Sequence, residues 1–215
     1  MTSADTYHHG DLRRVLMDGA LDVIASDGLA GLSLRAVAAK AGVSHAAPYH
    51  HFEDKASLVR SLGFEGLRLL DARMAAAEAT APGDAAVRLL AIGTAYVEFA
   101  AEAPAYFIAM GAPEMRATVP EHPAEAHGEP WERLVGAVAA CQAEGLLACG
   151  DPALTAIGLW SLVEGLSQLW LGGAMAQVPH AADGAGPLAR HVLAAMIPLM
   201  RPALPAVDPA AASVD

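Results

Sequence analysis

A run of short and hydrogen-bonding side chains in the first quarter of the chain has the composition of a nucleic-acid contact. His45, Ala46 and Ala47 are short or polar, as a close approach to base edges requires, and Ser44 is expected to cap their helix. Tyr49 and His50 follow, and their longer side chains can reach a phosphate backbone. For Tyr49 an alternative is an aromatic side chain in the core with its hydroxyl at the surface. A serine that caps a helix also leaves first-turn amide protons free to bind a phosphate. The segment therefore predicts hydrogen bonds to the base edges and backbone of a duplex.

A cation a few residues later supports the same interpretation. Lys55 falls in the first turn of a predicted helix, where a positive charge opposes the helix dipole by about 0.3–1 kcal/mol. A bound phosphate would reverse that penalty. The alternative is a solvated ion pair with Glu53 or Asp54. Ser33 and Arg35 are secondary candidates, and for Arg35 a phosphate contact and a plain surface position stay equally open.

Two short helices around a glycine turn would position these side chains. Ser33 can cap a first helix whose apolar residues have the spacing of one buried face, namely Leu34, Val37, Ala38 and Ala41. Gly42 can adopt the left-handed conformation that ends this helix, and Val43 can fold back onto its core. Ser44 then begins a second helix, in which Pro48 removes the first internal hydrogen bond and predicts a tightened turn. Phe52 is expected to be buried. This is the form of a helix-turn-helix that enters the major groove.

The strings YHHGDLR at residues 7–13 and GVSHAAPY-HF-DK at residues 42–55 resemble the amino-terminal domain of TetR-family transcriptional regulators. The resemblance covers about residues 7–58 and is strongest to a subgroup that carries both strings, including the proline. It implies an all-helical homodimer, with a three-helix DNA-binding head and a larger body that binds a small effector. It also implies a phosphate contact at Lys55.

Composition and charge agree with two parts of different character. The 215 residues are 54% hydrophobic and 17% charged, which excludes a disordered chain. Residues 1–64 carry six basic and seven acidic side chains, and residues 65–215 carry seven and seventeen, so the net charges are −1 and −10. Five of the nine histidines lie in the first part and would gain charge beside phosphates. We expect modest nonspecific affinity for DNA.

The sequence predicts a cytoplasmic protein without a membrane span. The first ten residues do not have the pattern of a secretory signal. Cys141 and Cys149 would lie about 12 Å apart along one helix, too far for a disulfide. The apolar run 153–176 has Glu164 at its middle. Placing a carboxylate at the centre of a bilayer costs about 2.5–3.5 kcal/mol, so a buried helix in a soluble protein is the better interpretation.

Helices are predicted along the whole chain, about nine in all. The predicted ranges are 11–26, 33–41, 44–50, 55–78, 84–102, 104–110, 130–147, 152–176 and 187–204, the last interrupted by Pro198. Residues 1–9 are expected to be a mobile arm, and 112–129 a loop or a broken helix. The predicted domains are a DNA-binding domain over residues 1–54, an effector-binding and dimerisation domain over 55–204, and a disordered tail over 205–215.

Gly158, Gly165 and Gly172 recur every seven residues and leave one stripe of the eighth predicted helix without side chains. A second helix can approach closely there. We expect this stripe to form a two-fold, four-helix dimer interface with the ninth helix. The alternative is tight packing within one subunit.

Aromatic and sulphur side chains gather in the segments expected to line an effector cavity, although ordinary core packing would also explain most of them. Within the stretch from Trp160 to Gly165, Glu164 replaces the histidine of the Trp-x-x-x-His-Gly pattern seen in the resembling subgroup. A buried carboxylate needs a partner, so Glu164 is expected to face a cationic effector or Gln168. The predicted pocket comprises Tyr96, Phe99, Tyr106, Phe107, Met110, Trp131, Trp160 and Glu164, and Trp170 belongs to the same aromatic group.

No catalytic set, cofactor motif or metal site is expected. The acids and histidines at Glu121, His122, Glu125, His127 and Glu129 match no metal-ligand spacing, and a solvated loop is the better interpretation. The sequence thus predicts a dimeric regulator that binds a palindromic operator in double-stranded DNA and is a repressor released by a small-molecule effector. The alternative is a helical dimer that mainly binds a small molecule and has a degenerate head.

Overall fold

Helices build the fold, as the sequence predicts. A computed structural model describes residues 9–116 and 123–200, and these two ranges contain no strand. Among the helices in this part of the chain, none combines the length and the apolar character that crossing a bilayer demands.

The head consists of α1 (His9–Gly31), α2 (Leu34–Lys40) and the 3-10 turn η1 (Ala47–His50). Regular helical geometry in α1 ends at Gly28, whose φ is 69°, where the sequence predicts the end of the first helix. Ser33 caps α2, because its hydroxyl accepts the Ala36 N–H at 3.1 Å. The head core takes in apolar side chains from α1 and α2 together with Leu58 and Leu62 of the next helix.

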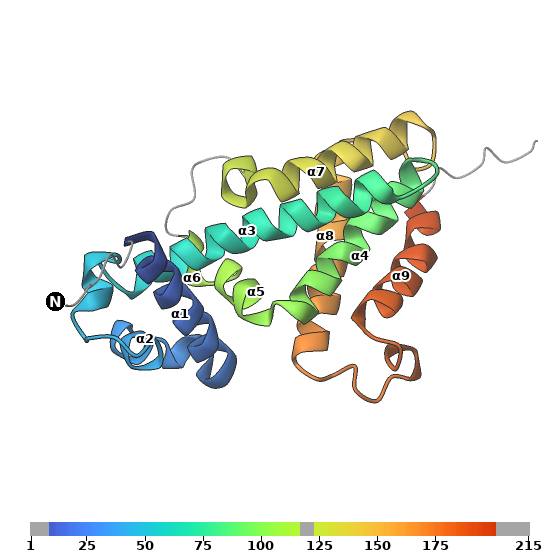
Figure 1. Ribbon diagram of the computed structural model, residues 1–215. Coiled ribbons are helices and arrows are strands. Elements are labelled where there is room, and N and C mark those ends of the chain that lie inside the picture. The colour runs from blue at the N-terminus through green and yellow to red at the C-terminus, as the bar shows by residue number, and fades with distance from the viewer. Residues whose placement is uncertain (1–8, 117–122, 201–215) are drawn as a thin grey trace, which may run out of the picture.

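That next helix, α3 (Lys55–Thr80), connects the head to the body. A reciprocal capping box fixes its start: the Asp54 carboxylate accepts the Ser57 N–H at 2.7 Å, and the Ser57 hydroxyl accepts the Asp54 N–H at 3.2 Å. Figure 1 shows α3 running from the head along the length of the body. Its second half contributes Leu70 and Met74 to the body core, so α3 belongs to both cores.

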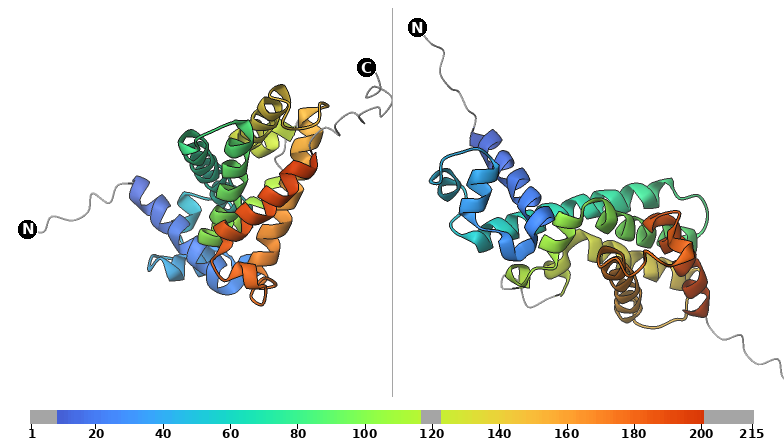
Figure 2. Two further views of the ribbon diagram at one scale, coloured as in Figure 1. Left: turned by 90° about the vertical axis from the view of Figure 1, so that its right-hand side faces the viewer. Right: turned by 90° about the horizontal axis from the view of Figure 1, so that it is seen from below.

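The body packs its helices around α4 (Ala85–Glu102), which contacts α3, α8 and α9. Its other elements are α5 (Pro104–Met110), α6 (Pro113–Arg116), α7 (Pro123–Ala143), α8 (Pro152–Leu171), η2 (Pro179–Ala181), α9 (Ala185–Met196) and η3 (Ile197–Met200). Figure 2 shows α8 and α9 side by side on the face of the body turned away from the head.

Two arginines hold α3 against the body. Arg133 on α7 donates to both oxygens of Asp71, at 2.8 and 3.0 Å, and to Glu78 at 2.8 Å. Arg73 on α3 donates to Glu102 of α4 at 2.6 and 2.8 Å. Fork-shaped guanidinium contacts of this kind fix orientation as well as distance.

The start of α7 differs from the prediction. The helix begins at Pro123, and Pro130, the predicted first residue, lies inside it with a buried ring. Proline removes one helical hydrogen bond, and the apolar burial of its ring compensates part of that loss. The short α6 also falls within the stretch predicted as a loop or broken helix.

Several helices end earlier in the chain than predicted. α7 ends at Ala143 rather than near Leu147, and α8 ends at Leu171, where Gly172 is its carboxy-terminal cap. α9 stops at Met196, just before Pro198, so the predicted interruption is confirmed. Of the expected arm at 1–9, His9 is the first residue of α1, whereas residues 1–8 and the expected tail at 205–215 lie outside the described residues.

Candidate DNA-binding surface and effector-binding cluster

The turn that follows α2 has the predicted geometry. Gly42 adopts a φ of 69°, and the Val43 N–H donates to the Ala38 carbonyl at 3.0 Å, which closes the end of the helix. Val43 packs against the head core. The turn therefore fixes the direction in which the next segment leaves α2.

The segment after Ser44 is not the predicted α-helix. The Ala47 N–H donates to the Ser44 carbonyl at 3.0 Å and the Tyr49 N–H to the Ala46 carbonyl at 3.2 Å, the i to i+3 pattern of a 3-10 helix. Pro48 cannot donate a hydrogen bond, and its buried ring holds the segment against the head. The predicted tightened turn is confirmed. The predicted cap at Ser44 is wrong, because Ala46 precedes η1 and no side chain caps it.

The predicted base-reading side chains share one exposed surface. Ser44, His45, Ala46 and His50 are all exposed, and Tyr49 is 58% exposed. The alternative of a core position for Tyr49 is therefore wrong. Phe52 is buried, as predicted. We refer to residues 44–50 as the η1 surface.

The two secondary candidates lie at the start of α2. Arg35 is exposed, which leaves its guanidinium accessible to a phosphate. The hydroxyl of Ser33 is engaged as the cap of α2, so its demonstrated role is to start the helix.

Lys55 has a partner that the sequence does not predict. Its ammonium group donates to the Leu29 carbonyl at 2.8 Å, so it ties the start of α3 to the end of α1. Within the described residues, neither Glu53 nor Asp54 forms an ion pair with it. A lysine ammonium has three donors, so this bond leaves donors for a phosphate.

Arg13 is a residue of the head whose role sequence reasoning missed. Its guanidinium lies 5.3 Å from the centre of the Phe52 ring and donates to the Ser61 hydroxyl at 3.0 Å. It thereby joins α1, the end of the η1 segment and α3. Nothing in the local spacing indicates these contacts, because Ser61 lies 48 residues away in sequence.

In the body, a chain of hydrogen bonds connects α4 and α8. The Trp160 indole N–H donates to the Tyr96 hydroxyl at 3.3 Å, and the Tyr96 hydroxyl donates to Glu164 at 2.6 Å. The Gln168 amide donates to the other Glu164 oxygen at 2.9 Å, so the predicted Gln168 partner is confirmed. Burial, and then the neighbouring Glu164 carboxylate, raise the pKa of Tyr96 well above its usual range.

Aromatic contacts extend this group to four helices. The Tyr96 and Phe107 rings meet edge to face at 5.8 Å between centres, and those of Trp131 and Trp160 at 6.4 Å. We call Tyr96, Phe107, Trp131, Trp160 and Glu164 the body cluster.

The other three predicted pocket residues lie apart from the contacts of the body cluster. Phe99 is buried in the body core. Tyr106 and Met110 lie against Gly66 of α3, where an added Cβ would come within 2.9 Å of the Met110 sulphur. The structure thus brings together five of the eight predicted pocket residues.

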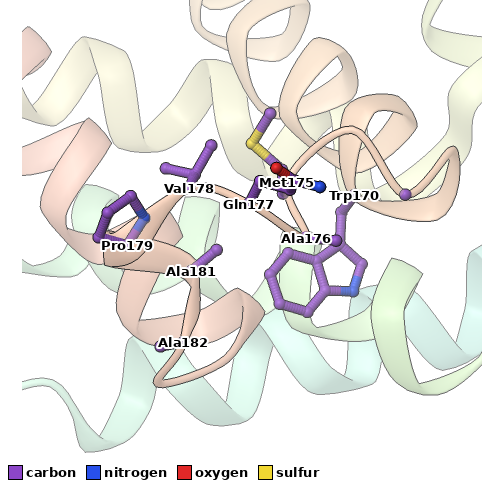
Figure 3. Close-up of a pocket in the computed structure, with 9 residues that line it drawn as sticks. Trp170, Met175, Ala176, Gln177, Val178, Pro179, Ala181 and Ala182 are labelled. Atoms are coloured by element: carbon purple, nitrogen blue, oxygen red, sulfur yellow. The ribbon is translucent and has the colours of Figure 1, made fainter.

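A pocket of about 440 Å³ opens elsewhere, between the end of α8 and the start of η2. Figure 3 shows the Trp170 indole along its wall. Of the aromatic residues expected to line a cavity, Trp170 lies in its wall. The other lining residues are Gly173, Met175, Ala176, Gln177, Val178, Pro179, Ala181 and Ala182.

The structure describes only some of the acids and histidines at 121–129, where the sequence predicts that no metal binds. Glu121 and His122 lie outside the described residues, and so do the side chains of Glu125 and His127. Among the side chains that are described, no three potential ligands gather to hold a metal ion.

A helical head with an exposed turn after a glycine, carried on a larger helical body, defines the class of helix-turn-helix regulators. Residues 16–62 match the tetR family of bacterial regulatory proteins, and residues 89–212 match the tetracyclin repressor-like carboxy-terminal domain. The chain belongs to the tetR family. Because this is a family of regulatory proteins, membership agrees with the expectation that the chain is not an enzyme.

The chain is also similar to individual proteins and solved structures. A protein of unknown function from Rhodococcus sp. RHA1 is 30% identical, with coverage of 93% of this chain and 100% of that one and a TM-score of 0.74. The uncharacterized HTH-type transcriptional regulator YobS of Bacillus subtilis is 31% identical over 98 residues, 46% of this chain and half the length of YobS. AibR, solved in complex with isovaleryl coenzyme A and operator DNA, shares the fold at 17% identity, with a TM-score of 0.67 and coverage of 87% and 98%.

Proposed function

We propose that this protein is a dimeric, sequence-specific DNA-binding transcriptional regulator that acts in the cytoplasm as a repressor and is released by a small-molecule effector. The η1 surface is the observation that carries the proposal, because Tyr49 and His50 are exposed while Pro48 and Phe52 are buried beneath them. Residues 1–54 would form the DNA-binding domain, and residues 55–204 the effector and dimerisation domain. The finer likeness to the subgroup with the GVSHAAPY segment and the Trp-x-x-x-His-Gly pattern belongs to this proposal.

On DNA, the η1 surface would enter the major groove. Ser44, His45 and Ala46 would approach base edges, whereas Tyr49, His50 and Lys55 would contact phosphates, with Arg35 and Ser33 at the margin. Two heads related by a two-fold axis require a palindromic operator, with half-sites about one helical turn or a multiple of it apart.

Selection of binding sites from a random duplex library tests this function directly. The full chain should enrich a palindrome with two related half-sites. Failure to enrich any sequence would favour the alternative, a dimer that binds small molecules and has a degenerate head.

The dimer is supported by an apolar exposed face on α8. Leu154 is 68% exposed, Leu169 is 49% exposed, and Gly158 and Gly165 lie between them on the exposed side. An added Cβ would meet nothing within 4 Å at Gly165, so packing within the described subunit does not account for this glycine. Leu199, 74% exposed after α9, would extend the same interface.

The matched substitutions Gly165→Leu and Gly136→Leu test the interface. Both glycines lie on exposed helix faces, and neither would bring an added Cβ within 4 Å of another residue. Gly165→Leu should shift the sedimenting species toward monomer, whereas Gly136→Leu should leave it unchanged. A wild-type chain that sediments as a monomer at micromolar concentration would overturn the dimer.

The effector would bind at the body cluster, with Phe99, Tyr106 and Met110 as outlying members of the predicted pocket. Support comes from the convergence of α4, α5, α7 and α8 on Tyr96 and Trp160. AibR binds isovaleryl coenzyme A and operator DNA, which is a precedent for effector and operator on one such chain. A change in spacing of the two heads, transmitted through α3, would release the DNA.

A further inference from the structure

Glu164 is a half-buried carboxylate whose hydrogen-bond partners, within the described residues, are neutral donors. Its two oxygens accept hydrogen bonds from the Tyr96 hydroxyl at 2.6 Å and the Gln168 amide at 2.9 Å. A carboxylate offers about four acceptor positions, and these two bonds occupy one on each oxygen. The bonds orient the group but bring no positive charge to it.

The cations on the four helices that carry the body cluster are engaged elsewhere. α5 and α8 contain neither lysine nor arginine. Arg133 of α7 binds Asp71 and Glu78, and Arg88 of α4 binds the Gly83 carbonyl and Glu144. Among the described side chains, no lysine or arginine pairs with Glu164. A carboxylate that loses part of its hydration without a counter-ion favours a cation from outside.

Aromatic rings complete an environment suited to such a cation. The faces of tryptophan and tyrosine rings attract positive charge, most strongly where water is excluded. Tyr96 and Trp160 hydrogen-bond within the group around Glu164, and Trp131 packs on Trp160 at 6.4 Å. The net charge of −10 on residues 65–215 would also attract cations from solution.

We propose that the effector is an organic cation, a substituted amine or quaternary ammonium ion, that binds Glu164 and the rings of Trp131 and Trp160. This inference rests on the proposed effector function and names its ligand class. Gln168 and Tyr96 act as positioning residues, because their hydrogen bonds orient the Glu164 carboxylate.

Binding of a charged probe and its uncharged isostere tests the proposal. The probes are benzyltrimethylammonium and neopentylbenzene, which differ in shape very little and in charge by one. The full chain carries Trp170→Phe, so that the fluorescence comes from Trp131 and Trp160 alone. At constant ionic strength, the cation should quench this emission saturably and bind at least about tenfold more tightly than the isostere.

The matched substitutions Glu164→Gln and Glu132→Gln distinguish a direct contact of the cation with Glu164 from the general attraction of a negatively charged body. Both remove one negative charge, and Glu132 is exposed on α7. Glu164→Gln should weaken binding of the cation at least about tenfold and leave binding of the isostere unchanged. Glu132→Gln should change neither affinity. Equal binding of both probes, equal effects of both substitutions, or no saturable binding by the wild type at millimolar cation would overturn the proposal.

A gel shift of the same variants on the selected operator keeps the two proposals apart. Operator binding with no ammonium selectivity would leave the DNA-binding function intact and refute only the ligand class. Ammonium binding without operator binding would support the ligand class and refute the DNA-binding function.

Discussion

Replacing Arg133 with methionine is expected to destabilise the protein by about 2–3 kcal/mol. The Arg133 side chain is 23% exposed and Asp71 is 12% exposed, and Glu78 receives the third bond of the guanidinium. Breaking a fully buried pair costs about 3–5 kcal/mol, whereas exposed pairs contribute about 0.2–1 kcal/mol. The partial exposure places Arg133 between these limits, because its loss leaves two carboxylates facing an apolar methionine stem.

Urea unfolding followed by far-UV circular dichroism measures this change. Protein concentration must be held fixed, since the proposed dimerisation would couple stability to concentration. The control is Arg68→Met on α3, whose ion pair with Glu65 is similarly short at 2.7 Å but whose side chain is 62% exposed. The control should cost below about 1 kcal/mol. In thermal melts, Arg133→Met should lower Tm by roughly 4–12 °C.

A double-mutant cycle with Asp71→Asn identifies the source of the loss. The coupling energy between Arg133→Met and Asp71→Asn should be at least about 1 kcal/mol, because the groups share two hydrogen bonds. The reasoning would be refuted by a coupling energy near zero, or by equal losses in Arg133→Met and Arg68→Met.

Three further predictions concern the head and the thiols. Gly42→Ala should cost about 1–2 kcal/mol in urea unfolding because φ is +69°, whereas Gly136→Ala on the exposed face of α7 should be neutral or stabilising; equal effects would contradict the strained geometry. Burial raises the pKa of Cys141 to about 11, so above pH 9 the unfolded thiol loses its proton while the folded one keeps it, and stability should fall as pH rises from 9 to 11. Cys141→Ala should flatten that part of the pH profile, and in the native state a thiol reagent should modify the exposed Cys149 only. Lys55→Ala should weaken operator and random DNA alike and reduce the salt slope; an unchanged slope would leave Lys55 only its bond to Leu29.

Local rules predict the head well because its signals act over a few residues. The Ser33 cap reaches only to Ala36, and Gly42 needs only its own φ. The prediction of an α-helix over 44–50, where the structure has the 3-10 turn η1, fails for an equally local reason. The sequence predicts that Pro48 tightens the turn, but the effect of this proline extends over the whole segment, so the backbone keeps the 3-10 pattern through His50.

The body depends on packing that a sequence does not display. Pro123 and Pro130 are both acceptable first residues of a helix, and only the burial of Pro130 in the folded body decides between them. Tyr96 and Glu164 are 68 residues apart, so composition can nominate them but cannot pair them. Gln168 was predictable as a partner because it lies one helical turn after Glu164.

Fluorescence anisotropy with the selected operator and a scrambled duplex of equal length tests the central claim most directly. Wild-type protein should bind the operator at least about a hundredfold more tightly than the scrambled duplex at physiological salt. Tyr49→Ala, which removes a side chain 58% exposed on the η1 surface, should weaken operator binding at least about tenfold without lowering Tm. Equal affinity of the wild type for both duplexes, or full operator affinity in Tyr49→Ala together with His45→Ala and His50→Ala, would contradict a DNA-reading role for this surface.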